Sequence, residues 1–268
     1  MPIDEVILTQ IAYNEPNKKE LDLSYRTNSG QPKLKATDIK SLVIALAQNT
    51  IIDHLDLGFH DLGDEGATIL AKNLTRIKHI QLRENLIGPQ GAQALASNRY
   101  FIELGLHGNN IGDEGIAAFA NNTTLEELRI GNNDITNHGI KLLATNNTLF
   151  SLISRSNRIN DEGVGAWLSN HTLQKAIFEG CFASAAMNAK LAEKLQQNQR
   201  LAAQLAAEQN PITKANLKAF IKHQPANVPS LLELGLFAVK RYIQQGTINQ
   251  AQVQMLPFDL IESYQLMR

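Results

Sequence analysis

The chain repeats one pattern of apolar residues at a step of 24 or 25 residues, and this repeat constrains the fold more than any other feature. One apolar column consists of Leu55, Ile80, Leu104, Leu128, Leu152 and Ala176. A second column lies two residues later and consists of Leu57, Leu82, Leu106, Ile130 and Phe178, with Ser154 as the exception. Three residues further on stand Asn85, Asn109, Asn133 and Asn157, with His60 and Cys181 in register. Such self-similarity predicts a stack of equivalent units, each packed only on its neighbours.

Each unit has one segment that reads as a strand and one that reads as a helix. The two apolar columns are separated by one residue, so their side chains point to the same side of a short strand. The Asn side chain after the strand can bond backbone groups that have no ladder partner. The "GDEG" segments then open a helix, which Asp64, Asp113 and Asp161 can cap. Helix ends are predicted at residues that tolerate a left-handed turn, namely Asn73, Asn98, Asn122, Asn146 and Asn170.

The pattern LxxLxLxxN/CxI resembles the leucine-rich repeat, and "GDEGxxxLAxN" resembles its ribonuclease-inhibitor-like class. The resemblance implies an α/β fold, a horseshoe-shaped solenoid with a parallel sheet on its concave side and helices outside. About eight copies fill residues 19–212, including a degenerate first copy with Leu21 and Leu23 and a degenerate last copy with Leu205 and Ala207. Residues 1–18 are expected to form an N-terminal helical cap, and residues 213–268 a C-terminal all-α domain.

Composition limits the kinds of partner. The net charge is −1, so no overall field favours nucleic acid or a membrane surface. The single cysteine and the lack of a signal-like or membrane-spanning segment indicate a reducing, cytoplasmic setting. The chain contains Asn-x-Thr triplets, such as Asn122-Thr123-Thr124 and Asn170-His171-Thr172. If these triplets were glycosylation sites, they would imply secretion. Because they recur at the repeat interval, a structural role is the better interpretation.

Features that resemble catalytic sites follow the repeat as well. The acid pairs Asp64/Glu65, Asp113/Glu114 and Asp161/Glu162 recur at one place in the unit, and Cys181 occupies the Asn column. No metal-ligand spacing, phosphate loop or nucleophile motif is present, so we expect no enzyme activity and no cofactor. Ran GTPase-activating proteins are similar to this repeat class and act at their N-terminal edge. The loop at 26–36 and Arg26 lie at that edge, which leaves a remote alternative.

The side chains that flank the inward leucines are expected on the concave face, which is the predicted surface for a protein partner. Mixed charge, exposed histidine and an apolar step at Ile153 and Ile177 suit such a partner. The alternative is an ordinary solvated face. The candidate residues are Asp22, His54, Asp56, His79, Gln81, Arg83, Glu103, His107, Glu127, Arg129, Arg155 and Glu179.

The stretch "NVPSLLELGLFAVKRYIQQG", residues 227–246, reads as a helix that is apolar nearly all round and must be covered on more than one side. Its "SLxxxGxxxV" resembles the elongin-binding helix of SOCS and von Hippel–Lindau boxes, although these usually have Cys, Ser or Ala at the glycine position. The resemblance assigns elongin docking to Leu231, Gly235 and Val239. The later "LPFDLIESY" resembles a cullin box and assigns cullin contacts to Leu256, Pro257, Leu260 and Tyr264.

Two functions follow from these two surfaces. In the first, the chain is a substrate receptor that holds a protein on its concave face and docks to elongin B/C and a cullin of a ubiquitin ligase. In the second, it is a plain binding module whose C-terminal helices only cap the solenoid. A bacterial effector secreted into the cytosol of a eukaryotic host would fit either design.

Overall fold

The computed structural model describes residues 5–13, 17–25 and 32–207. The residues assigned to elongin and cullin docking, together with Arg26 and the predicted C-terminal domain, lie outside these ranges. The predicted domain boundaries at residues 18/19 and 212/213 stay predictions.

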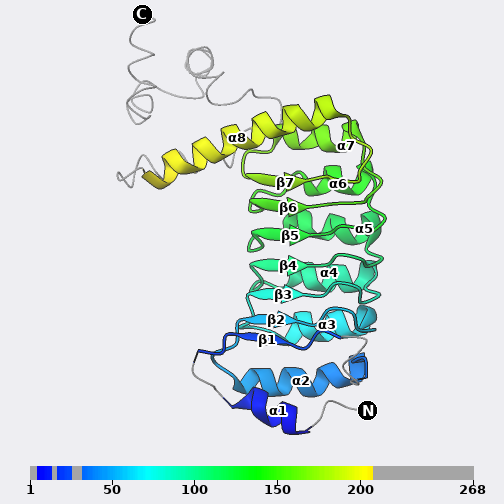
Figure 1. The fold of residues 1–268 in the computed structure, drawn as a ribbon, viewed down its shortest axis with the longest axis vertical. Helices are drawn as coiled ribbons and strands as arrows, with labels where there is room; N and C mark the ends of the chain where they lie inside the picture. Colours follow the sequence, from blue (N-terminus) through cyan, green and yellow to red (C-terminus); the bar gives the residue numbers. More distant parts are fainter. Residues whose placement is uncertain (1–4, 14–16, 26–31, 208–268) are drawn as a thin grey trace, which may run out of the picture.

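Seven three-residue strands form one open, parallel sheet in chain order (Figure 1). The register pairs equivalent positions of consecutive units, as in Leu55 with Ile80 and Leu104 with Leu128. This arrangement confirms the predicted α/β leucine-rich-repeat solenoid. The strands are β1 (Glu20–Asp22), β2 (His54–Asp56), β3 (His79–Gln81), β4 (Glu103–Gly105), β5 (Glu127–Arg129), β6 (Ser151–Ile153) and β7 (Lys175–Ile177).

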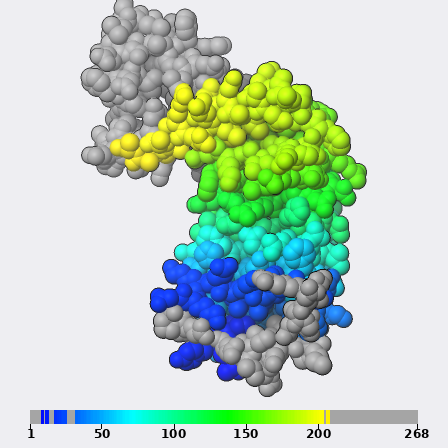
Figure 2. Space-filling model, in the orientation of Figure 1, coloured from blue at the N-terminus to red at the C-terminus, as the bar shows by residue number. Residues whose placement is uncertain are grey.

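Helices cover one face of the sheet along the whole stack (Figure 1). Figure 2 shows the units following one another along the molecule in chain order, from blue to yellow. Neighbouring strands lie about 4.8 Å apart, whereas packed helices need about 8–10 Å, so the sheet occupies the inner, concave side. The helices are α1 (Glu5–Ala12), α2 (Ala36–Gln48), α3 (Gly63–Asn73), α4 (Pro89–Ser97), α5 (Gly112–Ala117), the 3₁₀ turn η1 (Ala118–Asn121), α6 (Asn137–Leu143), α7 (Asp161–Gly165), the 3₁₀ turn η2 (Ala166–Ser169) and α8 (Ala185–Ala207).

The core lies between the sheet and the helices. In the central units both apolar columns are fully buried, as are Ile87, Ile111 and Ile135 after the Asn column. The Asn column is buried with them and forms the predicted ladder. Asn109 donates from Nδ2 to the carbonyls of Leu82 and Leu106, both at 2.9 Å. It accepts at Oδ1 from the amides of Asn85 and Ile87, both at 3.0 Å. Each ladder residue thus ties two units together.

The two ends of this ladder use other residues. Cys181 takes the last position and donates from Sγ to the carbonyl of Ser154 at 3.1 Å, and burial raises the pKa of its thiol. His60 takes the first position, where its Nδ1 accepts from the amide of Leu34 at 3.0 Å. Its Nε2 therefore carries the proton and donates to the carbonyl of Leu23 at 2.7 Å. Burial lowers the pKa of His60, which keeps the ring neutral and able to make both bonds.

The prediction of left-handed turns at the helix-ending asparagines is wrong. Asn98, Asn122 and Asn170 have extended backbones with φ of −67°, −71° and −81°. Their side chains form a second buried ladder instead. Asn122 donates to the carbonyls of Ala96 and Asn98 and accepts from the amides two and three residues later. The Asn122 and Asn170 triplets are structural, because these asparagines are at most 7% exposed.

The prediction that Asp64, Asp113 and Asp161 cap the helices of their own units is also wrong. None of them is the N-cap residue of its own helix, and each side chain reaches the next unit instead. Asp64 Oδ1 accepts from the amides of Gly88 and Gly91 at 2.7 and 2.8 Å. Asp113 bonds Thr136 and Asp161 bonds Ser184 in the same way. These carboxylates stabilise the start of the following helix, where backbone amides are unpaired.

The strand expected for an eighth unit is absent, because Leu205 and Ala207 belong to α8, which runs for 23 residues. No β-branched residue, glycine or proline interrupts positions 185–207, so helix propensity continues through the expected strand. At the other end, α1 packs on α2, and Asn49 donates to the carbonyl of Ile11 at 2.7 Å.

Candidate binding surface on the concave face

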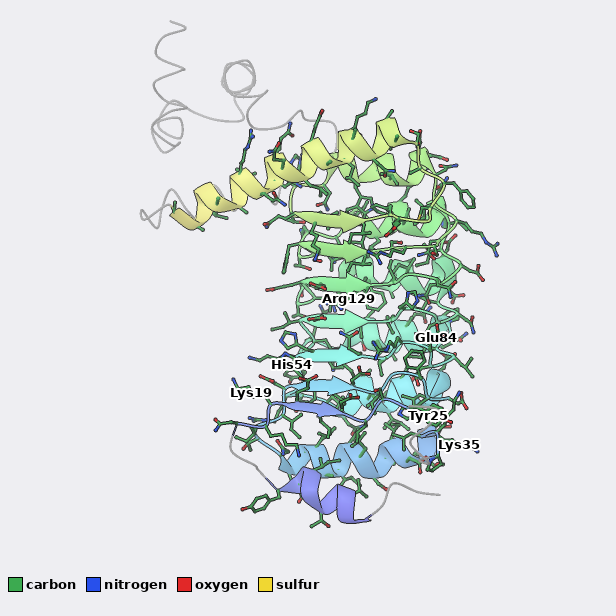
Figure 3. The ribbon with its side chains drawn as sticks, in the orientation of Figure 1. Lys19, Tyr25, Lys35, His54, Glu84 and Arg129 are labelled. Atoms are coloured by element: carbon green, nitrogen blue, oxygen red, sulfur yellow. The ribbon has the colours of Figure 1, made fainter. Side chains whose placement is uncertain are left out.

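The twelve candidate residues lie on one face of the sheet, over seven consecutive units. One row runs through Glu20, His54, His79, Glu103 and Glu127, which are register partners on adjacent strands. A second row begins with Asp22, Asp56 and Gln81 and passes Gly105 to Arg129. The third row lies just after the strands, where backbone hydrogen bonds still link consecutive units, and consists of Arg83, His107, Arg155 and Glu179. Figure 3 shows His54 and Arg129 at separate heights of this face.

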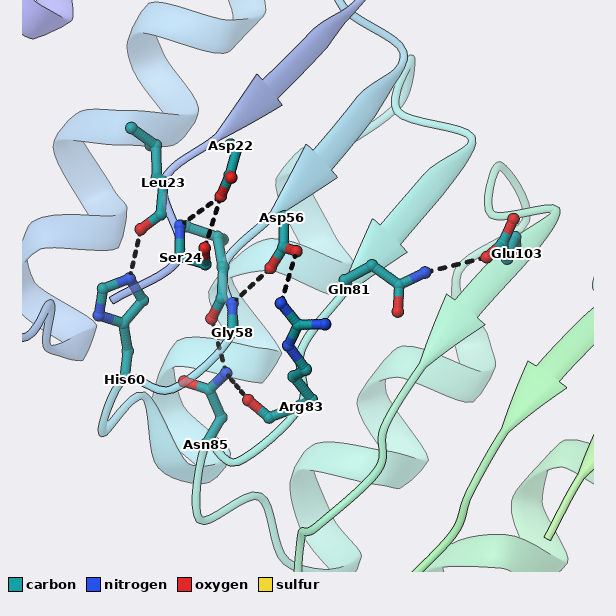
Figure 4. Close-up of polar contacts among 11 residues, drawn as sticks. Asp22, Leu23, Ser24, Asp56, Gly58, His60, Gln81, Arg83, Asn85 and Glu103 are labelled. Atoms are coloured by element: carbon teal, nitrogen blue, oxygen red, sulfur yellow. Dashed lines mark hydrogen bonds and ion pairs between the residues drawn. The ribbon is translucent and has the colours of Figure 1, made fainter. Parts of the chain in front are cut away.

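Glu103 is the centre of a polar network on this face. Its Oε1 accepts from Gln81 Nε2 at 2.9 Å (Figure 4). The same oxygen accepts from Arg129 Nη2 at 2.9 Å. Its Oε2 lies 3.2 Å from His79 Nδ1, which donates if that nitrogen carries the proton. Arg129 is also bound to Glu127 at 2.7 Å. One carboxylate on β4 thus holds side chains of both neighbouring strands, β3 and β5, in fixed positions.

The rings of His54 and His79 stack on each other beside this network. Their centroids are 4.0 Å apart and their planes differ by 7°. His54 Nδ1 lies 2.6 Å from Asp53 Oδ1, so each imidazole has a carboxylate at its Nδ1. Burial raises the pKa of Asp53, but its hydrogen bond to His54 and the nearby positive groups, including Lys19, outweigh burial and lower it. Asp53 is therefore ionised and orients the imidazole pair.

Arg83 is held on the N-terminal half of the face by three neighbours. Its Nη2 lies 3.3 Å from Asp56 Oδ2 (Figure 4). Its guanidinium carbon lies 5.0 Å from the centre of the Phe59 ring. Its stem lies flat over Gly58, where a β-carbon would come within 2.8 Å of Arg83 Cγ. Its Nε is buried and has no hydrogen-bond acceptor among the described residues. The guanidinium is therefore oriented but not fully satisfied.

Glycines give the face its shape at two further positions. Gln81 lies over Gly105, where a β-carbon would be 1.8 Å from its Oε1. His107 lies over Gly131, where a β-carbon would be 2.7 Å from its Nδ1. Long side chains thus extend along the stack rather than away from it. Towards the C-terminal end, Arg155 pairs with Glu179 at 3.3 Å beside the half-buried Ile153 and Ile177.

Sequence reasoning missed Phe59 and Asp53 as parts of this surface. Phe59 has a left-handed backbone with φ of +65° and is 42% exposed. Left-handed φ recurs at this position in later units, where the residues include Gly108, Asn132 and Gly180. Phenylalanine fits this conformation poorly, because its β-carbon crowds the backbone. An aromatic residue in a column otherwise free of apolar side chains was the signal that could have identified it.

The described residues contain no group of three or more His, Cys, Asp or Glu that could hold a metal ion. None of the described helices is both long and apolar enough to span a membrane. The three acid pairs lie at unit junctions, away from the sheet face.

Comparisons with known proteins agree with the repeat. Three segments, residues 48–71, 97–120 and 121–144, match the family model described as Leucine Rich repeat. No curated protein sequence matches the chain. A leucine-rich repeat protein of Leptospira interrogans is similar in structure, with 21% identity, a TM-score of 0.44, and coverage of 71% of this chain and 43% of that protein. The chain thus spans less than half the length of that protein. The tropomodulin C-terminal domain of Caenorhabditis elegans is similar at 14% identity and a TM-score of 0.38, with coverage of 76% and 98%.

Proposed function

We propose that this protein is a non-catalytic protein-binding module and that its concave face is the binding surface. The observation that carries this proposal is the polar network centred on Glu103, in which side chains of neighbouring strands hold one another in place while Arg129 stays 42% exposed. Arg83, held by Asp56 nearby on the same face, is also 42% exposed. Leucine-rich repeats typically serve protein–protein interaction, and the extended face of a solenoid suits a protein better than a small molecule.

The fixed side chains would favour binding through a low entropy cost. An interface residue that is already ordered avoids roughly 0.5–1.5 kcal/mol of side-chain ordering when a partner binds. Arg83 and Arg129 are held by carboxylates, and both keep donors that point away from these contacts. Arginine and aromatic residues often dominate binding energy, so Arg83 with Phe59 is the expected centre of contact.

Site-specific photo-crosslinking in cells tests this proposal. A benzophenone amino acid replaces Gln81 on the concave face or, as the matched control, Gln93 on the exposed surface of α4. We expect one crosslinked protein from position 81 and none of the same mass from position 93. Purified partner should then bind at least tenfold more weakly to Arg83→Ala. Equal crosslinking from both positions, or a partner indifferent to Arg83, would refute the concave face as the site.

A second, finer proposal is that the chain is a substrate receptor of an elongin–cullin ubiquitin ligase. Its support is the order and spacing of Leu231, Gly235 and Val239 followed by Leu256 and Pro257 in the sequence. In this proposal the concave face holds the substrate and the C-terminal residues dock to elongin B/C. The plain binding module remains the alternative, with those residues serving as a cap.

Calorimetric titration of the full chain with purified elongin B/C separates these alternatives. We expect micromolar binding that Leu231→Ala abolishes and that the control Leu236→Ala, off the predicted stripe, retains. Absence of binding by the folded wild type would leave the plain module. The remote GTPase-activating alternative predicts faster GTP hydrolysis by a Ran-type GTPase, and an Arg26→Ala variant would lose that effect.

A further inference from the structure

Basic side chains gather on the edge of the solenoid where the chain enters the strands. The main chain links these entry loops from unit to unit, as the amide of Asp53 bonds the carbonyl of Lys19 at 3.0 Å. The amide of Lys78 bonds the carbonyl of Asp53 at 2.9 Å in the next unit. Figure 3 shows Lys19 at this edge. We use the name basic edge for five exposed cations that precede strands β1, β3 and β4 in the chain: Lys19, Lys72, Arg76, Lys78 and Arg99.

None of the five cations of the basic edge forms an ion pair with a described residue. Cations elsewhere on the concave face and at the opposite edge are mostly paired. The pairs are Lys33–Asp61, Lys40–Glu65, Arg83–Asp56, Arg129–Glu127, Lys141–Glu162, Arg155–Glu179 and Arg158–Asp134. Lys35, Lys175 and Arg200 likewise form no ion pair with a described residue. The basic edge is distinct because five such cations lie on neighbouring units, and the nearby carboxylate of Asp53 offsets only part of their charge.

Two arginines of the basic edge are already oriented along it. Arg76 donates from Nη2 to the carbonyl of Thr50 at 3.0 Å, towards the preceding unit. Arg99 donates from Nη1 to Thr123 Oγ1 at 2.9 Å, towards the following unit. Both contacts are with neutral oxygens, so each guanidinium keeps donors and its full charge for another group. Tyr100, next to Arg99, is 51% exposed and offers apolar area at the same edge.

We propose that the basic edge binds a short acidic segment of a protein partner. From β1 to β4 the edge crosses three strand spacings, about 14 Å, which is the length of about four residues of extended chain. Carboxylates along such a segment would meet Lys19, Lys78 and the two arginines in turn. The inference concerns a different surface from the concave face, so it does not depend on the function proposed above.

Longer polyanions fit this edge less well, because the adjoining sheet face is acidic. Over β1–β5 that face carries five carboxylates against Arg83 and Arg129, which leaves −3 with histidines neutral. A nucleic acid or an anionic membrane would bring phosphates over these acids, whereas a few residues of peptide can stay on the edge. The five carboxylates belong to Glu20, Asp22, Asp56, Glu103 and Glu127.

Fluorescence anisotropy with the full-length protein tests the proposal. The probe is a labelled hexaglutamate peptide at low salt, with hexalysine and a six-nucleotide oligothymidine as comparisons. The test variant is Arg76→Gln with Lys78→Gln. The matched control is Lys141→Gln with Arg158→Gln, which removes two cations that are paired on other parts of the surface.

We expect saturable binding of hexaglutamate that weakens about tenfold in the test variant and less than twofold in the control. Binding should also weaken as salt rises, because the contacts are exposed. Equal losses in both double variants would overturn the proposal, since they would report net charge alone. Tighter binding of oligothymidine, or no saturation by 1 mM peptide, would overturn it as well. None of these results depends on contacts made by Arg83 on the concave face.

Discussion

Replacing Asn109 by leucine tests the claim that the asparagine ladder holds the units together. Asn109 is 5% exposed and makes four short bonds to backbone groups of two units. Leucine has the same number of side-chain heavy atoms but makes none of these bonds. The amides of Asn85 and Ile87 and the carbonyl of Leu82 would then be buried without their partners. The carbonyl of Leu106 keeps a second donor, Asn133 Nδ2 at 2.8 Å.

The expected cost follows from those three groups. A buried polar group left without a partner costs about 1–3 kcal/mol, and the added apolar side chain recovers part of the total. We therefore expect Asn109→Leu to lower the free energy of unfolding by about 4 kcal/mol, a large part of the ~5–15 kcal/mol typical of a folded domain. The matched control is Asn110→Leu, because Asn110 is exposed and its change should stay within ~0.5 kcal/mol.

Urea unfolding followed by circular dichroism measures the loss, and hydrogen exchange locates it. Exchange should become faster first at the amides of Asn85 and Ile87, which lose their acceptor. Asn109→Cys should cost less than Asn109→Leu, since the chain itself places Cys181 in this column. An unfolding free energy for Asn109→Leu within 1 kcal/mol of the wild type would refute the reasoning.

Three further results are expected. Stability should fall as the pH drops from about 6.5 to 4, because burial lowers the pKa of His171 to about 4 and also lowers that of His60, so the unfolded chain binds more protons in this range. Urea unfolding at pH 7, 5.5 and 4.5 should show a weaker pH dependence in His171→Gln. Stability that rises on acidification would contradict this expectation. Asp64→Ala should lower the free energy of unfolding, measured by thermal unfolding, by about 1–2 kcal/mol, because it removes two hydrogen bonds from backbone amides. Glu65→Ala changes an exposed neighbour and should cost less than ~0.5 kcal/mol, and equal effects of the two variants would count against the bridging role of Asp64. Phe59→Asn should raise stability by about 0.5 kcal/mol, since asparagine tolerates the left-handed backbone better, and a loss above ~1 kcal/mol would show that the Arg83 contact outweighs the strain.

The repeat and its strand positions were predictable because they depend on local periodicity. The spacing of Leu104 and Leu106 identifies a strand, and the recurrence of Asn109 identifies the turn that follows it. The acid positions were predictable, but their partners were not. Asp64 was expected to bond its own helix, and it bonds a unit 24 to 27 residues away. A sequence pattern gives the type of group that needs a partner but not which neighbouring turn supplies it.

The sequence by itself determined the step of the repeat, the strand and helix within each unit, and the side chains that flank the inward leucines on the concave face. These features follow from side-chain alternation and burial within about 24 residues. Only the tertiary structure decided where α8 continues through the expected eighth strand and which charges pair. It also decided where charge collects: a net charge of −1 separates into an acidic sheet face and an unpaired basic edge. Charge separation of this kind depends on stacking, which brings residues from four units to one edge while their total stays near zero.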